Sequence, residues 1–141
     1  MSDPKEKPVG QTKETGWQIG VRRTLSLRSE DAWTLLTSRK GIEAWLGATS
    51  GIDFSAGATY ALADGTAGEV RVFSANSHLR ITWRPKNWPK ASTIQVRVIP
   101  NNERCVIAFH QEHLPGPQER EERRAHFIQA LDVLQALAGM E

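Results

Sequence analysis

The sequence predicts an α+β fold in which a six- or seven-stranded antiparallel sheet is wrapped around a long C-terminal helix. Two observations lead to this prediction. Between residues 60 and 109, apolar and polar residues alternate in short segments separated by turn residues, as in strands with one buried face. After Pro117, apolar residues recur at helical spacing instead, over a length that would cross a small domain.

The length of 141 residues predicts one domain, at residues 16–141, preceded by a disordered tail at residues 1–15. The tail is polar, mixed in charge and has almost nothing to bury. It also lacks the apolar core of a secretory signal. No segment reaches the roughly 18 apolar residues of a membrane helix, so we expect a cytoplasmic protein without a membrane span.

Charge and cysteine content exclude several classes of partner and cofactor. The chain has 18 Lys and Arg against 16 Asp and Glu, so a formal charge of +2 gives no reason to expect nucleic-acid binding. Cys105 is the one cysteine, which excludes an intramolecular disulfide and a cysteine-based zinc site. We expect no metal and no cofactor, because His110 and His113 differ in strand parity and should point to opposite faces.

The first elements are a strand and two short helices. Alternating apolar residues predict a strand within residues 17–27. Ser29 is then predicted to cap a helix, because acidic residues follow it in the first turn and apolar residues recur up to Leu36. A second short helix is expected at residues 42–46, and it should end at Gly47.

Five further strands follow the helices and are joined by turns. Asp64-Gly65 is a strong hairpin signal between the first two of them. Because successive strands joined by short turns pair antiparallel, we expect a meander. The apolar residues that identify these strands are Tyr60 and Leu62, then Val70 and Val72, then Leu79, Ile81 and Trp83, then Ile94, Val96 and Val98, and finally Cys105, Ile107 and Phe109.

The C-terminal helix should cover the apolar face of this sheet. Its stripe consists of Phe127, Leu131, Leu134 and Ala138. Near its start, Glu119 and Arg123 have the i,i+4 spacing of a favourable surface ion pair.

Three segments resemble the SRPBCC or START-like superfamily, and within it the branch named after the activator of the ninety-kilodalton heat-shock chaperone's ATPase. They are SEDAWTLLTSRKGIEAWLG, DGTAGEVRVFSANSHLRITWRP and AFHQEHLPGPQEREERRAHFIQALDVLQAL. Gly68 matches the glycine that opens the family's third strand, Trp83 the tryptophan that ends the fourth, and Gln111 a polar residue near the end of the last. The chain departs from the family at His126-Phe127, where a Gly-Trp pair is usual.

The resemblance covers residues 16–139 and implies a helix-grip fold with a cavity beneath the last helix. Some relatives bind small hydrophobic molecules, and others catalyse cyclisation or dehydration. Co-chaperone activity belongs to eukaryotic relatives with an additional N-terminal domain, so the resemblance implies that role less strongly here. The resemblance specifies the fold rather than an activity.

The candidate site is the set of side chains expected to line the interior. A ligand site is typically apolar with a few polar groups that orient the ligand, and here the polar groups are Tyr60, Gln111 and His113. The same side chains could instead pack into a solid core. The full set is Trp45, Tyr60, Leu62, Val70, Val72, Ile81, Trp83, Val96, Ile107, Phe109, Gln111, His113, Phe127 and Leu131.

Three functions follow as hypotheses. The first is a non-catalytic binding protein for a small hydrophobic or aromatic molecule. The second is a cyclase or dehydratase acting on an aromatic or polyketide-like substrate, with His113 and Tyr60 as the candidate titratable groups. The third is a protein-interaction module that uses Trp88 and the exposed face of the sheet. The sequence assigns no catalytic residue.

Overall fold

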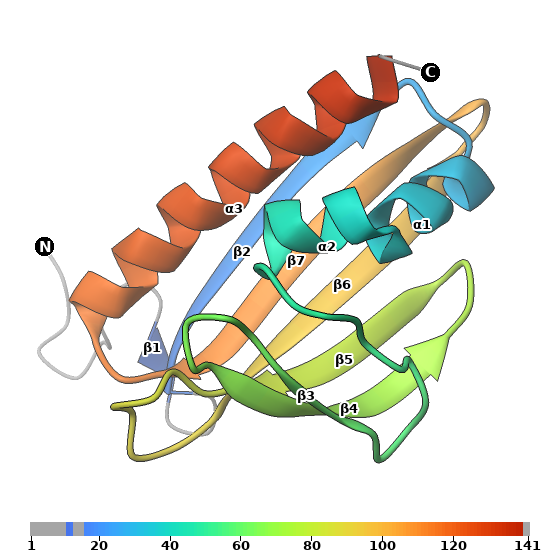
Figure 1. Ribbon diagram of the computed structural model, residues 1–141. Helices are drawn as coiled ribbons and strands as arrows, with labels where there is room; N and C mark the ends of the chain where they lie inside the picture. The colour runs from blue at the N-terminus through green and yellow to red at the C-terminus, as the bar shows by residue number, and fades with distance from the viewer. Residues whose placement is uncertain (1–10, 13–15, 140–141) are drawn as a thin grey trace, which may run out of the picture.

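A computed structural model of the chain describes residues 11–12 and 16–139, and it confirms the α+β helix-grip architecture (Figure 1). The elements are β1 (Gln11–Thr12), β2 (Gly16–Leu25), α1 (Ser29–Thr37), α2 (Arg39–Trp45), β3 (Thr59–Ala61), β4 (Ala67–Ser74), β5 (His78–Trp83), β6 (Ser92–Asn101), β7 (Arg104–Leu114) and α3 (Pro117–Gly139).

The strands form one seven-stranded antiparallel sheet in the order β1-β2-β7-β6-β5-β4-β3. All three helices lie on the same face of this curved sheet, and α3 runs along its length beside β2 and β7 (Figure 1). Gln11 and Thr12 of the predicted tail pair with the start of β2, and the rest of that tail lies outside the described residues. None of the described helices is long and apolar enough to cross a membrane.

Register explains how the alternating sequence builds a common inner face. In antiparallel pairs, residues opposite each other point to the same side of the sheet. Each row of paired residues across the strands therefore faces either the interior of the domain or the solvent. One row that faces the interior runs across five strands and contains a single polar side chain. Its members are Ile19, Gln111, Ile94, Ile81 and Val70, all of which are buried.

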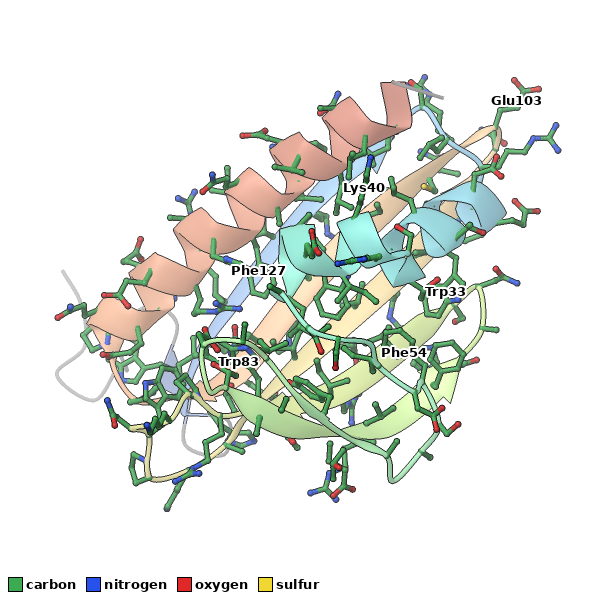
Figure 2. All side chains as sticks on the ribbon, viewed as in Figure 1. Trp33, Lys40, Phe54, Trp83, Glu103 and Phe127 are labelled. Carbon is green, nitrogen blue, oxygen red and sulfur yellow. The ribbon has the colours of Figure 1, made fainter. Side chains whose placement is uncertain are left out.

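An aromatic stack fills the space between the sheet and α3. Phe127 is fully buried, and its ring stacks on Phe109 of β7 with centroids 4.8 Å apart. Trp45, at the end of α2, lies on Phe109 at 6.0 Å and donates its indole N–H to the carbonyl of Leu36 at 2.8 Å. Figure 2 shows Phe127 beneath α3, facing the sheet. The stripe predicted for the last helix is therefore the contact that closes the domain.

The starts of α1 and α2 correct one expectation about helix capping. Ser29 is the first residue of α1, and Arg28 occupies the N-cap without a side-chain hydrogen bond. A serine hydroxyl does cap the next helix, since Ser38 Oγ accepts from the backbone N–H of Gly41 at 3.1 Å. Residue 41 must be glycine for the backbones of α1 and α2 to lie this close together, because a Cβ on Gly41 would overlap the carbonyl oxygen of Leu35.

Two bulges shift the predicted alternation. The register between β4 and β5 slips after Val70, so Val72 pairs with outward-facing Arg80 and is 37% exposed. Phe73 takes the inward place and stacks on Phe54 at 5.4 Å. The prediction that Val72 lines the interior is therefore wrong, because one extra residue in a strand moves the following side chains to the opposite face.

A second irregularity lies where β7 meets the start of β2. Trp17 pairs with Leu114, whereas Ile19 pairs with Gln111, so β7 carries an extra residue at this point. His113 adopts a positive φ of 65° there and its side chain is exposed, while Leu114 turns inward. His113 is therefore not an interior polar group, contrary to the expectation from simple alternation.

Phe127→Ala should lower the free energy of unfolding by about 3–5 kcal/mol, because a fully buried ring is lost and its stack with Phe109 is left open. The matched control is Val133→Ala on the same helix, where the side chain is 40% exposed and the change should stay within about 0.5 kcal/mol. Urea unfolding of both variants measures the difference. Equal stability of the two variants would show that α3 does not grip the sheet through this ring.

Candidate functional site

A cation lies on the buried face of α3, one helical turn before Phe127. Arg123 is only 9% exposed, although the helix surface on either side of it is polar. Side chains four residues apart share one face of a helix, so packing Phe127 against the sheet carries Arg123 into the interior as well. The expected surface pair with Glu119 is therefore wrong: Arg123 Nε donates to Gln111 Oε1 at 2.8 Å.

A chain of hydrogen bonds holds the guanidinium against the sheet. Gln111 Nε2 donates to Ser92 Oγ at 2.8 Å, and Ser92 Oγ donates to the carbonyl of Trp83 at 2.8 Å. Gln111 and Ser92 are both fully buried, so no solvent competes for these bonds. The chain fixes the orientation of the Gln111 amide and turns its oxygen toward Arg123.

Aromatic rings flank the same guanidinium. Its central carbon lies 4.0 Å from the centroid of the Trp83 ring and 5.0 Å from that of Phe127, which are cation–π distances. Trp88, from the loop after β5, packs edge-on against Trp83 at 5.3 Å. Figure 2 places Trp83 at the end of the sheet that lies under the first half of α3. We refer to Tyr60, Trp83, Ser92, Gln111 and Arg123 as the polar cluster.

Two donors in the polar cluster have no acceptor. Among the residues that the structure describes, Arg123 Nη2 and Trp83 Nε1 are the buried side-chain nitrogens without a hydrogen-bond partner. Leaving a buried donor unpaired costs about 1–3 kcal/mol, and more for a charged group. Most native side chains avoid this cost, so two exceptions on side chains in mutual contact need a physical reason.

The polar cluster also lacks a compensating anion. Burial lowers the pKa of Arg123 to about 10, against smaller opposing effects of Tyr60 and Asp64, so the side chain stays charged at neutral pH. No carboxylate in the described residues lies within ion-pair distance of Arg123. Asp64 is exposed, and its pKa is lowered chiefly by the hydrogen bond that it accepts from the backbone N–H of Thr66.

Tyr60 is the member of the polar cluster that lies beside Gly68. Its hydroxyl donates to the carbonyl of Thr82 at 2.6 Å, crossing over β4 to reach β5. Gly68 makes this crossing possible, because a Cβ at that position would overlap the Thr82 oxygen and lie 2.6 Å from the Tyr60 ring. Burial raises the pKa of Tyr60 well above its usual range, although the charge on Arg123 opposes this, so the phenol remains protonated.

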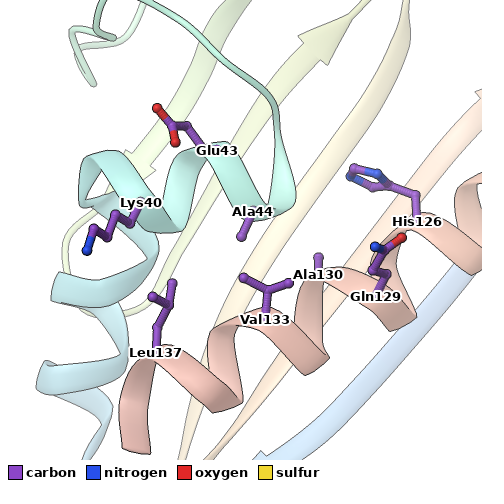
Figure 3. A pocket seen from close by; sticks show the side chains of 8 residues that line it. All are labelled: Lys40, Glu43, Ala44, His126, Gln129, Ala130, Val133 and Leu137. Atoms are coloured by element: carbon purple, nitrogen blue, oxygen red, sulfur yellow. The ribbon is translucent and has the colours of Figure 1, made fainter. Parts of the chain in front are cut away.

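A separate groove of about 560 Å³ lies on the surface between α2 and α3 (Figure 3). Its apolar lining comes from Ala44, Ala130, Val133 and Leu137, and its polar lining from Lys40, Glu43, His126 and Gln129. Other hollows lie beside Ile42 and residues 49–52, at residues 101–104, and on the outer face of the sheet around His110. None of the fourteen side chains predicted to line an interior site borders these four hollows.

His126 lines the α2–α3 groove and also forms a hydrogen bond with the backbone of Trp45 at the end of α2. Its Nε2 lies 2.7 Å from the carbonyl oxygen of Trp45, which can only accept, so Nε2 carries the proton and Nδ1 is left as an acceptor. Burial and the charge on Arg123 lower the pKa of His126, while the bond to Trp45 opposes this. His126 is therefore neutral at neutral pH.

The structure brings most of the predicted lining residues together. All of them except Val72 and His113 are buried in one interior, where Gln111 and Tyr60 join the polar cluster. Sequence reasoning missed Arg123 and Ser92. A signal for Arg123 was present, since it occupies the position one turn before Phe127 on the apolar stripe. Within residues 11–12 and 16–139, no group of three or more His, Cys, Asp or Glu side chains is placed to hold a metal ion.

Comparison with known families identifies the scaffold. The sequence profile of the family described as Activator of Hsp90 ATPase homolog 1-like protein matches residues 26–139, which confirms the resemblance inferred from the sequence. No curated protein has a significant match to the chain.

Solved structures show the same fold at low sequence identity. CalU16 from Micromonospora echinospora is 20% identical with a TM-score of 0.72, and the match covers 88% of this chain and 78% of CalU16. Protein MLL2253 from Mesorhizobium loti is 21% identical with a TM-score of 0.73, covering 87% of this chain and 97% of that one. An HSP90 activator from Plasmodium falciparum is 15% identical with a TM-score of 0.71, covering 88% and 97%. At these identities the similarity establishes the fold alone.

Gly68→Ala should lower the free energy of unfolding by about 1–3 kcal/mol, because the added methyl displaces Tyr60 from Thr82 and forces the strands apart. Gly20→Ala is the control, since a Cβ at Gly20 would meet nothing closer than 3.8 Å. Urea unfolding compares the two variants. A Gly68→Ala protein as stable as the Gly20→Ala protein would show that Tyr60 does not depend on this glycine.

Proposed function

The chain belongs to the Activator of Hsp90 ATPase homolog 1-like family, and on this scaffold we propose that it binds a small, largely apolar molecule between the sheet and α3. The proposed role is non-catalytic. The molecule would contact the aromatic residues Phe109, Phe127 and Trp83, and it would place a polar group against the polar cluster.

The observation that carries the proposal is the pair of unpartnered donors, Arg123 Nη2 and Trp83 Nε1. Small-molecule sites are mostly apolar and use a few fixed polar groups to orient the ligand. An acceptor atom of a bound molecule would remove the cost of both buried donors. A purely structural core gains nothing from retaining them.

Binding requires part of the structure to move, because side chains fill the space around Phe127. The loop at residues 85–90 is the segment best placed to do so. Trp88 in this loop is half-buried and covers Trp83, while Lys86, Asn87, Pro89 and Lys90 are exposed. The exposed side chain of Arg84 holds the loop through a hydrogen bond from its Nε to the Trp88 carbonyl at 2.7 Å. Displacing Trp88 would uncover Trp83 and the polar cluster beneath it.

The geometry favours binding over the cyclase or dehydratase hypothesis. That hypothesis needs an interior group able to exchange a proton, and it relied on Tyr60 and His113. The Tyr60 hydroxyl is engaged with a backbone carbonyl and its raised pKa keeps it protonated. His113 is exposed and lies outside the interior.

The interaction-module hypothesis has less support from the geometry than binding has. It relied on Trp88 and the exposed face of the sheet, and of these the Trp88 ring is half-buried and packs on Trp83 within the domain.

Native mass spectrometry and thermal unfolding test the proposal with a small panel: 2-naphthoate, 2-naphthamide and decanoate. A ligand that binds only the folded state at one hundred times its Kd should stabilise the protein by about 2.7 kcal/mol, seen as a raised Tm and a one-to-one complex. Val133→Lys is the control, because it blocks the α2–α3 groove and should leave the shift unchanged. Loss of the shift in this variant would place the ligand in the groove instead. No shift with any probe would refute the proposal.

A further inference from the structure

The polar cluster has an electrostatic imbalance that bears on the kind of molecule bound there. Arg123 is 9% exposed and charged, and its hydrogen-bond and cation–π partners are all neutral: Gln111, Trp83 and Phe127. Removing a charge from water costs several kcal/mol unless a counter-charge and hydrogen bonds compensate. The cation–π contacts and the bond to Gln111 compensate only in part, because none of these partners carries a negative charge.

The titratable groups around Arg123 do not supply the missing anion. Tyr60 remains a neutral phenol whose hydroxyl is directed to Thr82. His126 on the next part of α3 is neutral and turned toward Trp45. Asp64 is exposed, and its carboxylate accepts from the Thr66 backbone rather than from Arg123. Asp64 therefore offsets the charge on Arg123 only in part, and no carboxylate of the described residues forms an ion pair with it.

Resting on the proposed function, we propose that the molecule bound at the polar cluster is a hydrophobic carboxylate, whose two oxygens accept from Arg123 Nη2 and Trp83 Nε1. Both donors are buried and unpartnered, and both belong to side chains in contact, since the guanidinium carbon lies 4.0 Å from the centroid of the Trp83 ring. A carboxylate has two oxygens for the two donors and also supplies the missing charge. A neutral carbonyl or hydroxyl would satisfy a donor but leave the charge unbalanced.

The same contacts explain why the cation is an arginine. Its Nε is committed to Gln111, its planar face lies against Trp83, and Nη2 remains for the ligand. A lysine ammonium is a compact point charge that cannot stack and donate along fixed directions in this way. The apolar part of the ligand would lie along Trp83 and Phe127, which are the rings nearest to the bound carboxylate.

The test compares two nearly isosteric probes, 2-naphthoate and 2-naphthamide, by calorimetric titration at low salt. The wild-type protein should bind the naphthoate at least about tenfold more tightly, because only the carboxylate forms charge-assisted hydrogen bonds with Arg123. In Arg123→Met the two affinities should become equal within about twofold, with naphthamide binding retained. Arg123→Lys should keep a preference smaller than that of the wild type.

A second measurement does not depend on the folding of the Arg123 variants. In protein labelled with ¹⁵N-tryptophan, the Trp83 indole N–H resonance, assigned with Trp83→Phe, should shift downfield when naphthoate is added. Equal affinities of the wild-type protein for both probes, or an unmoved Trp83 resonance, would overturn the inference and leave the binding function standing. Failure of both probes to bind would instead refute the binding function itself.

Discussion

The packing of α3 against the inner face of the sheet is the contact on which the rest of the structure depends. Phe127, Leu131 and Leu134 are fully buried on one face of this helix, so its rotation about its own axis is fixed. Arg123 lies on the same face, one turn earlier. The hydrophobic contact that closes the domain therefore also determines that a cation is buried at the end of the sheet.

The surrounding residues reduce the cost of that buried charge without removing it. Gln111 takes one N–H, and Trp83 and Phe127 present their ring faces to the guanidinium. Nη2 and the indole N–H of Trp83 remain without acceptors among the described residues. These unpaired donors destabilise the core, but the side chains that carry them are held in a fixed arrangement. A local cost in stability of this kind is typical of functional sites, where stability and activity conflict.

The fold could be predicted from the sequence because its signals are local and repeated. Alternation in residues 79–83 and 94–98 identified two strands of the sheet, and the spacing of Phe127, Leu131 and Leu134 identified the covering helix. The bulges could not be predicted, because one extra residue changes parity without a distinct local signature, and they moved Val72 and His113 outward. Arg123 was missed for a related reason: whether a charged residue beside an apolar stripe is buried depends on which strand side chains face it, here Gln111 and Ser92.

The most direct test of the account is the free energy of unfolding of Arg123→Met, measured in urea without added ligand. Methionine keeps an unbranched apolar side chain in place of the arginine stem and removes the buried charge. The change also leaves the buried Gln111 Oε1 without its donor, which costs about 1–3 kcal/mol. If the cation is retained for binding, removal of the buried charge should offset this cost, so that stability falls by no more than about 1 kcal/mol. A loss of about 3 kcal/mol or more would contradict the account and show that Arg123 is chiefly a structural element of the core.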